Sequence, residues 1–151
     1  MTSPPETDRE YAYFSAIGSG DTSGISELLD LSPWEQWNVG DEYERREKLF
    51  IRRSSAWQLN SGLDDTRPIE EHLHSLLGRL QPRKLQLLQL ATQFKLQFVC
   101  VSYAYQSCSF EIPMEVQRSA TELGINFWFD GYCFGDIHEE ITELRSELNA
   151  K

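Results

Sequence analysis

The clearest pattern of hydrophobic positions along the chain has helical spacing and lies between residues 66 and 94. Apolar residues recur there at i, i+4, i+7, i+8 and i+11, namely Ile69, Leu73, Leu76, Leu77 and Leu80. This spacing predicts an amphipathic helix, which Pro82 interrupts. The same spacing continues beyond the proline at Leu85, Leu88 and Ala91, so we expect a second helix that begins near Pro82.

Capping residues and apolar spacing predict three further helices. The first follows the capping residues 21–23 and ends before Pro33, with apolar residues at Ile25, Leu28 and Leu29. The second opens at Pro113 and closes at Gly124, with one apolar face formed by Val116, Ala120 and Leu123. The third follows Asp136, and we expect its apolar residues to face the domain: Ile137, Ile141, Leu144 and Leu148.

Strand patterns separate these helices. The segment from Tyr11 to Ile17 is rich in aromatic residues and ends at a glycine-containing loop, and residues 96–105 and 125–134 are also typical of strands. We expect residues 110–112 to form a short hairpin partner. Between residues 49 and 59 four apolar residues occupy odd positions, which predicts a strand with one buried face: Leu49, Ile51, Trp57 and Leu59. Residues 34–47 have no clear period and are interpreted as a long irregular connection.

The order of these elements predicts an α+β fold. We expect a mixed sheet of four or five strands with the helices mainly on one face, built from two βαβ-like halves that a helix pair joins. Residues 1–10 are polar and are interpreted as a flexible leader, residues 11–134 as a single domain, and residues 135–151 as an acidic amphipathic helix packed on that domain.

Charge narrows the classes of partner. The chain has 151 residues and a formal net charge of -10, which repels nucleic acid and anionic lipid and favours basic proteins. No segment approaches the run of about 18 apolar residues that a membrane span needs. The three cysteines are odd in number and lack zinc-ligand spacing, so a reducing cytoplasm is the simplest compartment: Cys100, Cys108 and Cys133.

The sequence offers no catalytic constellation. The Gly18-Ser19-Gly20 turn lacks the third glycine of a dinucleotide site, and His72 and His74 point apart on a helix, where we expect them to face solvent or an edge. We therefore predict no catalytic residue, cofactor or metal. Five basic residues fall within nine positions, but interleaved glutamates favour a solvated, salt-bridged edge: Arg45, Arg46, Lys48, Arg52 and Arg53.

Aromatic residues provide the one constellation that could bind a partner. The expected strand registers place Tyr11 with Tyr13, Tyr103 with Tyr105, and Trp128 with Asp130 and Tyr132 on one face of each strand. If the strands are neighbours, these residues form one aromatic sheet face, although several could instead be ordinary core or edge residues. The candidate binding residues are Tyr13, Trp37, Tyr103, Tyr105, Trp128, Asp130 and Tyr132.

Several landmarks together resemble a known family. They are YAYF in the first strand, ISELLDLSP, WNVGD with Trp37 and Gly40, WQLNS at 57–61, PIEEHL at 68–73 and ELGINFWFDGY at 122–132. Their order and spacing over residues 11–134 are similar to those of domain of unknown function 4279. The resemblance implies an α+β fold in a bacterial, cytosolic protein and carries no activity.

Two hypotheses of function follow. The first is a non-enzymatic acidic interaction module that binds a basic partner protein, in the manner of the small acidic immunity proteins of bacteria. The second is a small-molecule binding domain or an unrecognised enzyme, with a pocket between residues 34–47 and the sheet that Trp37, Trp57 and Asp130 line. An open aromatic face would favour the first, and a closed pocket with convergent polar groups the second.

Overall fold

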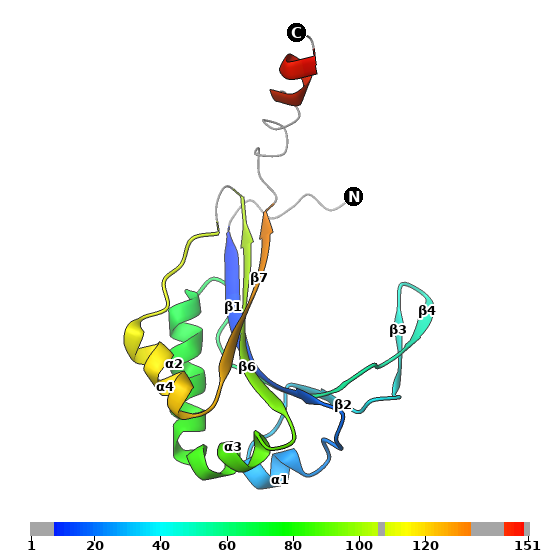
Figure 1. Ribbon diagram of the computed structural model, residues 1–151, viewed down its shortest axis with the longest axis vertical. Helices are drawn as coiled ribbons and strands as arrows, with labels where there is room; N and C mark the ends of the chain where they lie inside the picture. The colour runs from blue at the N-terminus through cyan, green and yellow to red at the C-terminus, as the bar shows by residue number, and fades with distance from the viewer. Residues whose placement is uncertain (1–7, 106–107, 134–143, 150–151) are drawn as a thin grey trace.

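The computed structural model describes residues 8–105, 108–133 and 144–149, which form a five-stranded mixed sheet, a separate hairpin and four helices in the main body (Figure 1). The sheet has the order β2-β5-β1-β6-β7. Its strands are β1 (Arg9–Gly18), β2 (Glu35–Trp37), β5 (Ser55–Asn60), β6 (Lys95–Ala104) and β7 (Asn126–Cys133). Neighbouring strands are antiparallel except β6 and β7, which are parallel.

The helices cover one face of this sheet (Figure 1). They are α1 (Ile25–Leu29), α2 (Ile69–Leu80), α3 (Lys84–Leu90) and α4 (Met114–Glu122), with a short 3₁₀ turn, η1 (Gln81–Arg83), between α2 and α3. The predicted α+β class is therefore confirmed, with a mixed sheet and helices on one side. The order β6-α4-β7 forms a parallel βαβ unit, whereas the two main strands of the first half, β1 and β5, are antiparallel neighbours.

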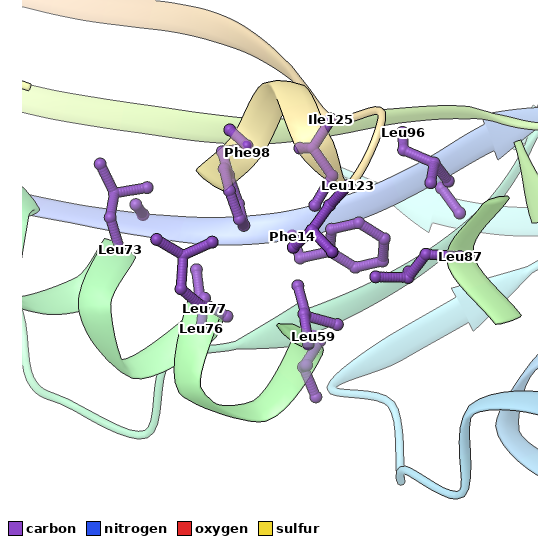
Figure 2. Packing of buried hydrophobic residues seen from close by; sticks show 14 of the residues in the cluster. Phe14, Leu59, Leu73, Leu76, Leu77, Leu87, Leu96, Phe98, Leu123 and Ile125 are labelled. Atoms are coloured by element: carbon purple, nitrogen blue, oxygen red, sulfur yellow. The ribbon is translucent and has the colours of Figure 1, made fainter. Parts of the chain in front are cut away.

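The core lies between the helices and the even-numbered positions of β1. Ala12, Phe14 and Ala16 are opposite Cys100, Phe98 and Leu96 of β6, and all six are buried. Leucines of α2 and α3 pack over these residues, together with Leu123 and Ile125 (Figure 2). The helix pair predicted around Pro82 is confirmed, but the buried residues of α3 are Leu87 and Leu90, while Leu85 is exposed.

The region between residues 34 and 51 differs from its prediction. Residues 34–47 contain two strands, β2 and β3 (Glu42–Arg45), and β3 forms a hairpin with β4 (Lys48–Ile51) that projects from the body (Figure 1). The single strand expected between Leu49 and Leu59 is two strands, β4 and β5, and Leu49 and Ile51 are 68% and 62% exposed. Alternating apolar residues identify a strand face, but they do not show whether another layer covers it.

Smaller differences lie at the ends of elements. Strand β1 begins at Arg9, two residues earlier than predicted, and residues 110–112 form no strand. The N-cap of α1 is Gly24, although Asp21 accepts a hydrogen bond from the backbone of Ser23.

Only part of the predicted C-terminal helix can be compared with the structure. Residues 144–149 are helical, but Leu144 and Leu148 are exposed rather than turned inward. The predicted cap Asp136 and the predicted leader residues 1–7 lie outside the described residues. Within the described parts of the chain, every helix is too short or too polar to cross a membrane.

Candidate functional site

The face of the sheet opposite the helices carries the candidate site. Odd-numbered residues of β1 point to this side, and the registers place Tyr13 opposite Val99, Val99 opposite Trp128, and Tyr103 opposite Tyr132. We call this surface the aromatic face and define it as Tyr11, Tyr13, Trp34, Tyr103, Trp128, Asp130 and Tyr132. It contains five of the seven predicted binding residues, which come from three adjacent strands.

The aromatic face has a buried floor and an exposed upper layer. Val99 and Val101 of β6, which lies between β1 and β7, form the floor and are buried. The Tyr103 and Tyr132 rings stack with centroids 5.0 Å apart, whereas Trp128 and Tyr132 are 56% and 42% exposed. Large aromatic side chains that remain exposed on a rigid sheet are typical of binding surfaces.

Two residues outside the list of candidate binding residues complete this surface. Tyr11 stacks beside Tyr13 with a centroid distance of 6.2 Å, and Trp34 meets Tyr13 edge to face at 5.7 Å. Tyr11 follows the same alternation as Tyr13, so the strand pattern already indicated it. Trp34 precedes β2, outside any strand pattern, and only its tertiary contact identifies it.

Asp130 is the one carboxylate within the aromatic face as defined. The hydroxyl of Tyr132 donates a hydrogen bond to Oδ2 of Asp130 at 3.0 Å. This bond raises the pKa of Tyr132, while the positive charge of Arg45 on the hairpin opposes the rise. The carboxylate therefore lies beside a neutral phenol, an arrangement that can accept the cationic group of a lysine or arginine.

Burial raises the pKa of the two phenols that β1 contributes to this surface, Tyr11 and Tyr13. It is the main cause that raises the pKa of Tyr11 to about 12, and the neighbouring Tyr103 adds to it. Burial also raises the pKa of Tyr13, with a further contribution from the charge of Asp130. Neutral phenols both donate and accept hydrogen bonds, so the aromatic face combines apolar rings with polar groups and a single negative charge.

Trp37 lies at the base of the hairpin rather than within the aromatic face. The Arg52 guanidinium is stacked between Trp37 and Tyr43, 3.8 and 3.9 Å from their ring centroids. Nε1 of Trp37 donates to the backbone oxygen of Ser54 at 3.1 Å, so Trp37 fixes the base of the hairpin. Tyr105 follows the end of β6, and its buried hydroxyl has no hydrogen-bond partner among the described residues.

The pocket expected from Trp37, Trp57 and Asp130 is not formed. Trp57 is fully buried on the helix side of β5, where its Nε1 donates to Oγ of Ser26 at 3.0 Å. Trp37 is opposite Ala56, one residue earlier, and therefore points to the other side of the sheet. Trp37 instead lines a hollow of about 670 Å³ beside the hairpin with Phe50 and Arg52.

His72 is buried, in contrast to the exposed or edge position predicted for it. Its Nδ1 lies 2.5 Å from Oγ of Ser61, which also accepts the backbone N–H of Leu63 at 3.2 Å. Burial lowers the pKa of His72, so the neutral ring anchors the loop before α2. His74 is exposed, with Nε2 3.6 Å from carboxylate oxygens of both Glu70 and Glu115.

The described residues contain no group of three or more histidine, cysteine or acidic side chains that could hold a metal ion. None of the three cysteines forms a disulfide, and Cys100 is buried whereas Cys108 and Cys133 are exposed.

Comparison with known proteins supports the family that the sequence landmarks indicate. No curated protein and no solved structure matches the chain. The family described as Domain of unknown function (DUF4279) matches residues 8–134, a range that spans every strand from β1 to β7, and the chain belongs to this family.

Proposed function

We propose that the protein is a non-enzymatic binding module that holds a basic partner protein on its aromatic face. The observation that carries this proposal is the sheet face that none of the described helices covers, on which Trp128 and Tyr132 remain exposed around Asp130 although the opposite face is packed with helices. The net charge of -10 supports a basic partner, because long-range attraction speeds encounter.

The exposed rings and the carboxylate of the aromatic face suit different parts of such an interaction. Trp128 and Tyr132 offer flat apolar surfaces that a partner can bury, and buried aromatic side chains dominate the energy of many interfaces. Asp130 can then receive a lysine or arginine, whose cation also stacks well on an indole or phenol ring. The partner therefore needs a basic group surrounded by apolar surface.

An immunity-type role is the specific form of this proposal, in which the module occupies and restrains a basic protein in a bacterial cell. The cytoplasm is the compartment that we assign to it. Three free cysteines, of which Cys108 and Cys133 are exposed, suit a reducing environment better than an oxidising one.

Affinity capture from the native host with three baits tests the proposal. The baits are the wild-type chain, a variant with Trp128→Ala and Tyr132→Ala, and a control with Leu85→Ala and Met114→Ala, two exposed residues on the helix side. We expect a basic protein that the wild type and the control retain and the aromatic variant loses. Equal capture by all three folded baits would show that the aromatic face is not the binding surface.

A small-molecule site is the second candidate. Tyr11, Tyr13 and Trp34 line a hollow of about 290 Å³ that also reaches Ser61 and His72, so rings and buried polar groups meet there. A metabolite that co-purifies with the wild type and is lost in Trp34→Ala would favour this candidate over protein binding.

A further inference from the structure

Strand β7 forms one edge of the sheet. Among the described residues it pairs only with β6, so its other side has no strand partner. Four of its eight residues are aromatic, and it contains no lysine or proline. Natural proteins usually protect such an edge, because its free N–H and C=O groups can pair with another strand. The opposite edge strand, β2, has only three residues.

Side chains on both faces of β7 are exposed. Trp128 on the aromatic face and Phe129 on the helix side are each 56% exposed. Docking on the aromatic face alone accounts for Trp128 but leaves Phe129 uncovered. The property that the two residues share is their position on the edge strand.

A groove accompanies the edge on the helix side. It has a volume of about 600 Å³ and is lined by Cys108, Ser109, Phe110, Ile112, Gln117, Phe127 and Phe129. The Phe129 ring lies 5.7 Å from Phe110 and stacks on Phe127 at 6.2 Å. An added strand would direct alternate side chains into this groove and toward the aromatic face.

We infer that the basic partner adds an extended segment to the edge of β7 that no described strand occupies, an inference that rests on the proposed function. Backbone hydrogen bonds along β7 supply affinity, and the two faces select the side chains, as in other complexes formed by strand addition. The groove accepts apolar residues. On the aromatic face Asp130 and the rings around it accept basic ones. The segment therefore alternates apolar and basic residues.

Charge favours a segment of another protein over a second copy of this chain. Each copy carries a net charge of -10, and β7 itself contains one charged residue, Asp130, and no cation. Two β7 edges would therefore bring like charges together, which disfavours pairing. A basic segment replaces that repulsion with attraction.

Selection of displayed random peptides of about ten residues, the length of a long strand, tests the inference on the full chain. We expect the enriched peptides to alternate apolar and basic residues. A synthetic copy of an enriched peptide should protect the backbone amides of β7 from hydrogen exchange. N-methylation of every second residue removes the N–H donors along one of the two edges of that peptide. It should weaken binding by about tenfold or more when the methylated edge is the one that pairs with β7. Phe129→Ser should weaken binding similarly, and Met114→Ser, which changes an exposed residue of α4, should leave it unchanged.

Several results would overturn the inference. The first is a selection that enriches no peptide, and the second is a peptide that binds equally well whichever of its two edges is N-methylated. The others are unchanged hydrogen exchange in β7 and a chain that forms dimers through β7. The captured partner separates the two proposals. If Trp128→Ala with Tyr132→Ala abolishes its binding while Phe129→Ser and β7 exchange show no effect, strand addition fails and the proposed function stands. If the aromatic variant also binds normally, the proposed function fails as well.

Discussion

Two tryptophans illustrate how position decides the role of the same side chain. Trp57 is fully buried against Phe14, with ring centroids 6.2 Å apart, and Trp128 is exposed on the aromatic face. We expect Trp57→Ala to lower the free energy of unfolding by about 3–5 kcal/mol, because it leaves a cavity. Trp128→Ala should cost less than about 1 kcal/mol. Chemical denaturation measures both, and equal losses would show that a layer covers Trp128.

Tyr11 makes the free energy of unfolding depend on pH in the alkaline range. Its pKa is raised to about 12, whereas an unfolded chain has a tyrosine pKa near 10. Above pH of about 10 the unfolded state loses the Tyr11 proton first, so the free energy of unfolding falls as pH rises toward about 12. Below about pH 10 this contribution is fully present. Tyr11→Phe should flatten the decline, measured by denaturation across this range. An unchanged slope in that variant would contradict the assignment.

The three cysteines should differ in reactivity. Burial, followed by the charge of Glu10, raises the pKa of Cys100 to about 12, and the thiolate is the reactive form. Cys108 and Cys133 are exposed. We therefore expect an alkylating reagent to modify two thiols of the native protein quickly and the third only on unfolding, as followed by mass spectrometry of intact protein and peptides. Early labelling of Cys100 would mean that the core opens readily.

At the residue scale, the sequence predicted which side chains share a strand face better than it predicted which faces are covered. The alternation in residues 125–134 placed Trp128, Asp130 and Tyr132 together, and the registers put them on the same face as Tyr103 of β6 and, across β6, Tyr13 of β1. A similar alternation between residues 49 and 59 predicted that Leu49 and Ile51 are buried, but both are exposed. Coverage depends on where the helices pack, and no local pattern contains that information.

At the scale of elements, the hairpin shows why a regular element can be missed when its sequence lacks the residues that usually mark it. Arg46 and Glu47 form its two-residue turn and have positive φ angles of 53° and 62°. Such turns favour Asn-Gly, because other residues are strained in this conformation. The segment contains Arg-Glu at this turn instead of Asn-Gly. Its many charged residues also interrupt the alternation of apolar and polar positions by which strands are predicted. The helix pair and α4, by contrast, combine apolar spacing with a proline or glycine boundary, and both were predicted.

This strain leads to a prediction for the hairpin. Arg46→Asn together with Glu47→Gly should stabilise it by about 1 kcal/mol or more, because the new residues adopt positive φ more easily. Hydrogen exchange of residues 42–51 should slow, while exchange in β6 stays the same. Faster exchange in the double variant would show that the Arg46 and Glu47 side chains hold the hairpin more strongly than turn geometry does.

At the scale of the whole molecule, the distribution of charge is uneven. Residues 42–53 carry five basic and three acidic side chains, a net charge of +2 in a chain of net charge -10. The hairpin itself, residues 42–51, carries three basic and three acidic side chains, so the excess of positive charge comes from Arg52 and Arg53 at its base. The charge of Glu35, by contrast, acts on the phenol of Tyr13 in the aromatic face. The proposed basic partner would consequently be attracted to the acidic body and repelled by the base of the hairpin, which would orient its approach.

This asymmetry predicts how the association rate responds to local charge. Screening acts over about 8 Å at physiological salt, so added salt should slow association with the captured partner. Glu35→Gln with Asp130→Asn should lower the on-rate more than Glu27→Gln with Glu122→Gln, which removes the same charge from exposed sites on α1 and α4. The aromatic variant should mainly raise the off-rate, because desolvated rings act after encounter. On-rates that are insensitive to salt and equal in both charge variants would exclude electrostatic steering toward the aromatic face.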